Sequence, residues 1–193
     1  MFYFLLSAYS WAYEPQNGDV IFQSSGSSQS EEIQLATQSK FSHVGIVYLD
    51  VKRGPVVFEA IAKVSLTSLA QWIARGEGKH YQVMRSKKAL SKKQLLAMKQ
   101  YGESLRGKRY DLLFQWSDQK MYCSELVWKV YQHGAGIELA IPKTFDSYNF
   151  DHPKVQKKLQ ERWGRRINWK EKVVAPSDLA QSDALRLVET TYP

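Results

Sequence analysis

The sequence predicts an α+β protein that folds as one domain, and three observations lead to this expectation. Two runs of β-type residues, 41–49 and 55–61, are joined by the loop 50–54, a pattern typical of an antiparallel hairpin. Apolar residues recur at helical spacing over 91–105 and again from Cys123 onward. The length of 193 residues and the hydrophobic content of 44% suit a single domain with its own core.

The remaining elements follow from turn residues, helix caps and short apolar runs. In chain order we expect a turn over 15–19, a strand over 20–22, a Ser/Gly/Gln loop over 24–30, a helix over 31–38 capped by Ser30, a helix over 65–75 capped by Ser65 or Thr67, a strand over 80–85, a helix over 154–163, a strand leading into a turn or short helix over 173–179, and an edge strand over 185–188. The helix over 91–105 has Ser91 as its N-cap, and its buried face is expected to hold Leu95, Leu96, Met98 and Leu105.

The hairpin predicts a pair of residues suited to catalysis. If it turns about Val51, residues whose numbers sum to about 102 pair, and His43 lies opposite Glu59. A carboxylate beside an imidazole fixes the ring tautomer and stabilises its cation. A slip of one residue would separate the two onto opposite faces.

Cys123 is the only cysteine of the chain, and it lies where an amphipathic helix begins. The positive end of a helix dipole and the free N–H groups there favour the thiolate, which is the nucleophilic form. The alternative is a small buried hydrophobe, the commoner role of a lone cysteine. One cysteine also excludes an internal disulfide and a thiolate-rich zinc site. We expect neither a metal nor a cofactor.

A nucleophilic thiol needs a base, and the base needs an orienting group. Of the four histidines, His43 alone has a candidate carboxylate opposite it, whereas His133 lies about 15 Å along the helix from Cys123. Asp111 is the main rival of Glu59 for the orienting role, with Asp118 behind it.

Six short motifs together resemble a known family. They are Gly18–Phe22, Ser42–Val47, Phe58–Ala60, Tyr110–Asp111, Tyr122–Val127 and Pro176–Leu179. In order and spacing they resemble the circularly permuted NlpC/P60 group of papain-like cysteine hydrolases, the YiiX/YebB-like branch. The resemblance implies one permuted papain-like catalytic domain over 13–193, with an antiparallel sheet or small barrel packed against the nucleophile helix.

The resemblance also implies roles for individual residues. Cys123 would be the nucleophile, His43 the general base and then acid, and Glu59 the orienting acid. The backbone N–H of Cys123 would stabilise the oxyanion. We expect Tyr110 and Asp111 to be oxyanion or substrate contacts, with Tyr110 as the second donor.

Three functions stay open at this point. The first is a cysteine hydrolase that cleaves the amide of a peptide, a cell-wall peptide, an N-acyl amino acid or a lipid amide. The second is a thiol-dependent lipid acyltransferase or lipid hydrolase, because the permuted group is also similar to lecithin:retinol acyltransferase-type enzymes. The third is a non-catalytic basic module that binds an anionic glycan or membrane.

The net charge of +8 indicates which kinds of partner the protein would attract. Basic residues are concentrated in 79–109 and 151–172, which suits either solvated helix surfaces or an anionic membrane or cell-envelope surface. No nucleic-acid-binding motif is present, so we expect no nucleic acid partner.

The first twelve residues are apolar, with small residues at Ser10 and Ala12. This pattern predicts the remnant of a truncated signal peptide, and therefore export to the bacterial periplasm or cell envelope. An apolar first strand in a cytoplasmic protein is the alternative. The stretch is too short to cross a bilayer as a helix.

Overall fold

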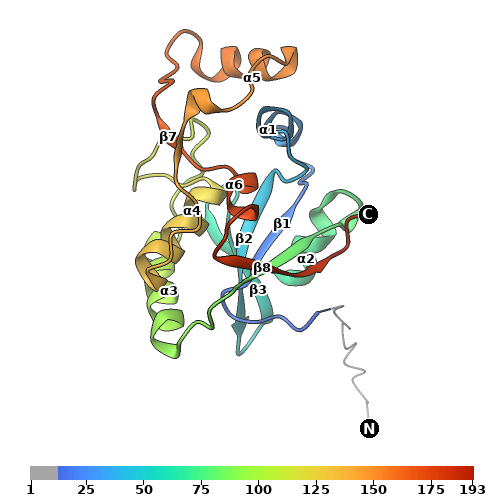
Figure 1. Ribbon diagram of the computed structural model, residues 1–193, viewed down its shortest axis with the longest axis vertical. Helices are drawn as coiled ribbons and strands as arrows, with labels where there is room; N and C mark the ends of the chain where they lie inside the picture. The colour runs from blue at the N-terminus through green and yellow to red at the C-terminus, as the bar shows by residue number, and fades with distance from the viewer. Residues whose placement is uncertain (1–12) are drawn as a thin grey trace.

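An antiparallel sheet of six strands forms the centre of the computed structural model, which describes residues 13–193 (Figure 1). The strand order is β4-β3-β2-β1-β5-β8, and every neighbouring pair is antiparallel. The strands are β1 Val20–Gln23, β2 His43–Asp50, β3 Gly54–Ala60, β4 Val64–Ser68, β5 Gln82–Ser86 and β8 Leu185–Thr190. The predicted hairpin and edge strand are confirmed, and the sheet is open rather than closed into a barrel because β4 and β8 are its two edges.

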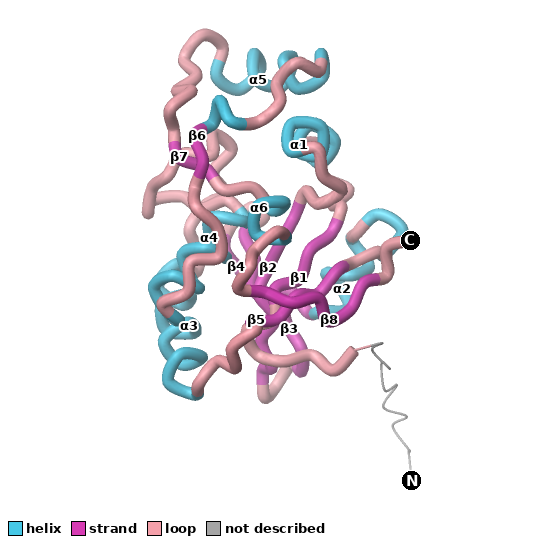
Figure 2. Tube along the Cα trace, in the orientation of Figure 1, coloured by secondary structure: helices cyan, strands magenta, loops and turns pink. Residues whose placement is uncertain are grey.

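Helices cover both faces of this sheet (Figure 2). The α-helices are α1 Ser30–Thr37, α2 Leu69–Arg75, α3 Lys92–Leu105, α4 Cys123–Val130, α5 Pro153–Trp163 and α6 Pro176–Ala180. Short 3₁₀ turns lie at η1 Glu77–Lys79 and η3 Phe145–Ser147, a π-turn at η2 Tyr131–Ala135, and a two-stranded ribbon joins β6 Lys143–Thr144 to β7 Lys172–Val173.

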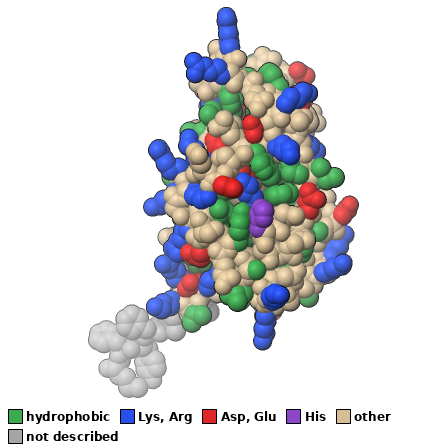
Figure 3. All heavy atoms as spheres, turned by 90° about the vertical axis from the view of Figure 1, so that its left-hand side faces the viewer, with side chains coloured by type: hydrophobic (Ala, Val, Ile, Leu, Met, Phe, Trp, Pro, Cys, Tyr) green, Lys and Arg blue, Asp and Glu red, His purple; other side chains and the backbone are tan. Residues whose placement is uncertain are grey.

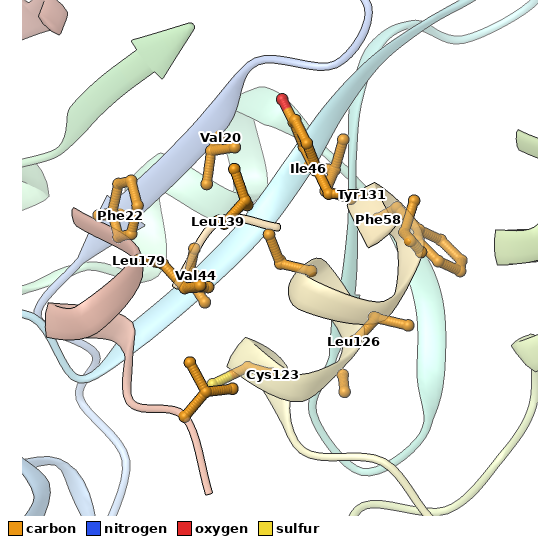
Figure 4. Close-up of a cluster of buried hydrophobic side chains, with 14 of the residues drawn as sticks. Val20, Phe22, Val44, Ile46, Phe58, Cys123, Leu126, Tyr131, Leu139 and Leu179 are labelled. Carbon is orange, nitrogen blue, oxygen red and sulfur yellow. The ribbon is translucent and has the colours of Figure 1, made fainter. Parts of the chain in front are cut away.

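The alternation of side chains along the strands separates two cores. On one face, residues such as Val44 and Ile46 of β2 pack against Leu126 and Val130 of α4 (Figure 4). On the other face, Val47 of β2 packs with the α2 side chains. The helix that begins at Cys123 is therefore held against the middle of the sheet, next to β2.

A third cluster lies apart from the sheet, where α1, α5 and the β6–β7 ribbon meet (Figure 1). It contains Phe145, Val155, Leu159 and Val173, with Trp163 packed against them. This cluster forms the outer wall of the cavity that leads to Cys123.

Helix α3 shows how local sequence sets an element. Ser91 is its N-cap as predicted, and Ser91 and Gln94 form a reciprocal capping box. Met98 and Leu105 are buried as expected, whereas Leu96 is 57% exposed, so its predicted inward position is wrong. The lysines of α3 are exposed, and Figure 3 shows Lys and Arg side chains spread around the face it draws rather than gathered in one patch.

Two predicted caps are wrong. The segment containing Ser65 and Thr67 is strand β4, which pairs with β3, and the cap of α2 is Ser68. Ser30 is the first residue of α1 rather than its cap, and its hydroxyl hydrogen-bonds Ser42. In both places a contact outside the helix, with strand β3 for Ser65 and Thr67 and with Ser42 for Ser30, competes successfully with the local capping pattern.

None of the helices in residues 13–193 is long and apolar enough to span a membrane. The segment 1–12, with its predicted signal-peptide remnant, lies outside the described residues.

Candidate active site

Cys123 is the first residue of α4, and its side chain is 3% exposed. Tyr122 before it has extended backbone, so the helix starts abruptly and its first N–H groups point out of the helix end. The backbone N–H groups of Ser124 and Val44 hydrogen-bond the sulfur. Figure 4 shows Cys123 at the start of this helix, at the border of the core cluster. The local sequence thus places the thiol where it was predicted.

His43 is the first residue of β2 and touches both Cys123 and Glu59. Its Nε2 lies 2.6 Å from Oε2 of Glu59, which leaves Nδ1 for the hydrogen bond with Cys123. The ring stacks on the fully buried Trp72 of α2, with 6.0 Å between centroids and 27° between planes. The imidazole is thus held on three sides.

Glu59 of β3 is fully buried, and each of its carboxylate oxygens accepts at least one hydrogen bond. Oε2 also accepts from Nη2 of Arg75 at 2.6 Å, and Oε1 accepts from the Thr67 hydroxyl at 2.5 Å. These donors hold the carboxylate toward His43.

Burial disfavours the charged forms of Cys123, His43 and Glu59, but their hydrogen bonds and charge pairs outweigh the effect of burial. Hydrogen bonds with Cys123 and Glu59 raise the pKa of His43 to about 9 against the effect of burial. Burial alone would raise the pKa of the Cys123 thiol, but the His43 contact and the backbone N–H groups lower it below its ordinary value. Likewise, His43 and Arg75 overcome burial and lower the pKa of Glu59 to about 2. These contacts therefore favour a thiolate beside an imidazolium over the neutral pair.

The hairpin register differs from the predicted one by two residues. Ile46 pairs with Phe58 and Asp50 with Gly54, so continuing the ladder places Gly45, and not His43, opposite Glu59. A shift of two keeps both side chains on the same face. Because Gly45 has no side chain, the imidazole of His43 can reach Glu59 diagonally across the two strands. A Cβ added at Gly45 would lie 3.4 Å from the Cβ of Glu59 and only 2.4 Å from Cγ1 of Val57.

Tyr110 and Asp111 lie in the loop before α4 and have different surroundings. The Tyr110 hydroxyl contacts Cys123 and accepts a hydrogen bond from Nε2 of Gln29 at 3.0 Å. Asp111 instead accepts from the backbone N–H groups of Leu113 and Gln115, at 2.9 and 3.0 Å. Asp111 therefore organises its own loop, and the idea that it rivals Glu59 at His43 is wrong.

The other candidates lie away from Cys123. Asp118 binds Lys129 at 2.8 Å. His80 hydrogen-bonds the backbone carbonyl of Thr191, and His133 packs on Tyr101. His152 accepts from the N–H of Lys154 at the start of α5.

Cys123 opens onto a largely apolar cavity that is continuous with solvent. Its walls come from α1, the loop before α4, α5 and the β6–β7 ribbon. Most of the lining is apolar, including Ile33, Ala36, Phe114, Phe145, Phe150, Leu159 and Trp163. Such a cavity suits an apolar group attached to the bond that the thiol attacks.

The sequence patterns did not identify the three residues that contact His43 and Glu59 from β4 and α2. Thr67 and Arg75 bind Glu59, and Trp72 stacks on His43, but all three belong to the segment 65–75, for which the sequence predicts one short helix. A Thr, a Trp and an Arg carry no catalytic signal when they stand alone. The pairing of β4 with β3 places Thr67 beside Glu59, and α2, which follows β4 directly, brings Trp72 to His43 and Arg75 to Glu59.

Two similar proteins come from Escherichia coli. The uncharacterized protein YiiX of strain K12 is 42% identical over 189 residues, which is 98% of this chain and 93% of YiiX. A crystal structure of YiiX from strain O157:H7, described as a metalloprotein, superposes with a TM-score of 0.90 at 43% identity, covering 94% of this chain and all of that one. These relatives share the fold described above.

The description of that crystal structure as a metalloprotein raises the question of whether the present residues fit a metal. Zinc sites use at least three protein ligands. Both oxygens of Glu59 are taken by donors, which leaves Cys123 and one nitrogen of His43. Within residues 13–193 no cluster of three or more His, Cys, Asp or Glu side chains is arranged to hold a metal ion. The described residues do not fit such a site.

A family match covers residues 14–189 and describes a permuted papain-like amidase enzyme, YaeF/YiiX, C92 family. The expected permuted papain-like fold and cysteine peptidase or amidase class are thereby confirmed, although the family bears a different name from the NlpC/P60 group that the motifs resemble. Because the match spans most of the chain, this protein belongs to the C92 family of permuted papain-like amidases, the group of YaeF and YiiX.

Proposed function

We propose that the protein hydrolyses an amide that carries an apolar acyl group, through a thioester on Cys123. The observation that carries the proposal is the continuous line of contacts from Cys123 through His43 to Glu59. N-acyl amino acids and lipid amides are the substrates that the cavity favours among those expected from the sequence. An imidazolium held by a buried carboxylate has the arrangement needed to give and take a proton at one fixed place.

The reaction has two halves. The thiolate of Cys123 adds to the amide carbonyl carbon, and the oxyanion accepts from the Cys123 N–H and the Tyr110 hydroxyl. The imidazolium of His43 protonates the leaving nitrogen, the C–N bond breaks, and an amine leaves behind a thioester. Water then gives a proton to His43 and adds to the thioester, the C–S bond breaks, and the acid departs with the thiolate restored.

The cavity supports an acyl substrate over a bare peptide. Its walls hold seven aromatic residues from different parts of the sequence: Tyr110, Phe114, Tyr122, Phe145, Tyr148, Phe150 and Trp163. Burial of a methylene group contributes about 0.8 kcal/mol. Each added carbon of an acyl chain should therefore strengthen binding until the cavity is full.

Turnover of N-dodecanoylglycine, compared with N-acetylglycine and a dipeptide, tests this proposal. We expect faster hydrolysis of the dodecanoyl compound, and an acid-quenched sample should contain protein carrying one dodecanoyl group on Cys123 by mass spectrometry. The Cys123→Ala variant should show neither product nor adduct. Hydrolysis that survives in this variant would remove Cys123 from the mechanism, and a preference for the dipeptide would assign the cavity to a peptide.

Acyl transfer is the second candidate, and the apolar lining of the cavity beside Cys123 favours it. A lipid alcohol or amine that enters this cavity would compete with water for the thioester. Product analysis with a phospholipid donor and an added amine separates the two, because transfer forms a new amide whereas hydrolysis releases free acid. An anionic membrane as the source of such a lipid stays a prediction from the net charge of +8.

A further inference from the structure

A chain of hydrogen bonds leads from α5 to the sulfur of Cys123. Nη2 of Arg162 donates to Oε1 of Gln29 at 2.7 Å. Nε2 of Gln29 donates to the hydroxyl oxygen of Tyr110 at 3.0 Å, and that hydroxyl contacts the Cys123 sulfur. All four residues line the cavity.

The chemistry of these groups sets the direction of every bond in the chain. A guanidinium has donors only, so the atom of Gln29 that faces Arg162 must be the amide oxygen. The other end of the amide, its NH₂ group, must then face Tyr110 and donate to it. The phenol oxygen is occupied as an acceptor, and its single hydrogen is free to point elsewhere.

The remaining direction is toward Cys123. Burial, with the neighbouring Cys123 charge, raises the pKa of Tyr110 well above its ordinary value, so the hydroxyl keeps its hydrogen at neutral pH. The sulfur of Cys123 is the contact that the hydroxyl makes besides Gln29. A thiolate, and later the oxyanion formed beside it, can accept this hydrogen.

We propose that Gln29, held by Arg162, is a positioning residue that makes Tyr110 a hydrogen-bond donor toward Cys123 and the reacting carbonyl oxygen. The inference rests on the proposed function, in which Tyr110 serves the oxyanion. It assigns a role to the α1–α5 contact beyond forming the cavity wall: Gln29 immediately precedes α1, and Arg162 is near the end of α5.

The Gln29→Glu variant tests the direction of the bond. A carboxylate of the same shape still accepts from Arg162, but it cannot donate to Tyr110 and instead takes the phenol hydrogen. Losing one oxyanion donor typically costs about 10²–10³-fold in kcat. We expect a loss of that order for Gln29→Glu and for Tyr110→Phe on N-dodecanoylglycine, with KM little changed.

The double variant separates positioning from the effect of a new negative charge. If Gln29 acts through Tyr110, Gln29→Glu should cost nothing further in a Tyr110→Phe background. Losses that multiply in the double variant would overturn the proposal. So would wild-type turnover in Gln29→Glu.

Glu31→Gln is the matched control. Glu31 pairs with Lys154 at 2.5 Å across the same two helices, but it does not touch Tyr110. Its turnover should equal that of the wild type, and a loss as large as that of Gln29→Glu would attribute the effect to the loosened helices and overturn the proposal.

A second measurement does not depend on amide hydrolysis. The pH at which iodoacetamide half-maximally alkylates Cys123 should rise in Gln29→Glu and Tyr110→Phe, because the thiolate loses a donor. The two variants should show the same rise alone and combined, and an unchanged midpoint in both would overturn the proposal. If the wild type forms no acyl-enzyme but these shifts occur, the proposed function fails while the positioning role holds.

Discussion

Single side chains at this site gain their properties from contacts that exceed the cost of their burial. Glu59 is the clearest example, since an isolated carboxylate would lose its charge in the core. Its three donors, from His43, Thr67 and Arg75, keep it ionised. The charge of Glu59 in turn supports the imidazolium of His43, and the imidazolium supports the thiolate of Cys123.

Replacing Glu59 should move the alkaline side of the pH profile. The active ion pair exists above the lowered pKa of Cys123 and below that of His43, which is about 9. Because Glu59 helps to raise the His43 pKa, Glu59→Gln should shift the fall of kcat/KM at high pH to lower pH and reduce its maximum. Glu103→Gln, which breaks only a surface pair with Arg106, should keep the wild-type profile. An alkaline side that stays near pH 9 in Glu59→Gln would contradict the role of Glu59.

Cys123 should react as a thiolate below the pH at which ordinary thiols do. A free cysteine has a pKa near 8.5, so at about pH 6 almost none of it is ionised. We expect iodoacetamide to alkylate native Cys123 at that pH many times faster than the same protein unfolded in guanidinium chloride. Since the chain has one cysteine, the unfolded sample is its own control. Equal rates would show that the fold does not activate the thiol.

At the scale of elements, local signals and pairing between strands compete. The sequence pattern correctly predicted α3 with its Ser91 cap, because a cap depends on residues within one turn. It placed Ser65 and Thr67 in a helix, although their backbone pairs with β3. A strand partner lies elsewhere in the chain, so a local pattern does not contain it.

The contact between α3 and η2 makes a prediction about stability. A Cβ at Gly134 would lie 2.4 Å from the Cα of Met98 in α3, so the backbones themselves must move apart in Gly134→Ala. Overpacking of this kind costs about 1–3 kcal/mol. We expect a lower midpoint of urea unfolding for Gly134→Ala. Gly26→Ala should leave the midpoint unchanged, because its nearest neighbour, the carbonyl of Arg75, would be 3.9 Å away. Equal midpoints for both variants would show that α3 and η2 are not tightly packed.

For the whole molecule, the decisive feature is that α1 and α5, far apart in the sequence, close one cavity beside α4. The permuted order of the chain does not prevent this, because catalytic roles depend on geometry rather than on order. Cys123 comes from α4, while His43 and Glu59 come from neighbouring strands of the sheet. Residues of α1 and α5 that line the cavity should therefore influence which substrate binds without taking part in bond breaking.

Changing the cavity wall should change acyl-chain preference without changing the reaction. Ala36→Phe on α1 would fill part of the cavity, so we expect slower hydrolysis of long N-acylglycines with little change for short ones. Ile33→Ala, one turn earlier on the same helix, would widen it and should favour longer chains. Hydrolysis rates for a series of N-acylglycines from acetyl to hexadecanoyl measure the chain-length preference of both variants. Parallel losses at every length would mean that acyl groups do not occupy this cavity.

The local sequence was sufficient for the strands of the hairpin, the start of α4 at Cys123 and the shared face of His43 and Glu59. Each of these depends on the period of two or 3.6 residues and on nearby turn residues. Even with the register two residues off, the pair stays on one face, because such a shift preserves the alternation. Folding in three dimensions decided that Thr67 and Arg75 bind Glu59, that Asp111 serves its own loop, and that Gln29 and Arg162 meet Tyr110. Gln29 is 81 residues from Tyr110 and 133 from Arg162, and the partners of Glu59 come from other secondary-structure elements, so packing rather than chain neighbours chooses these contacts. The contacts of Asp111 are local, but they lie in an irregular loop whose shape no helix or strand period predicts.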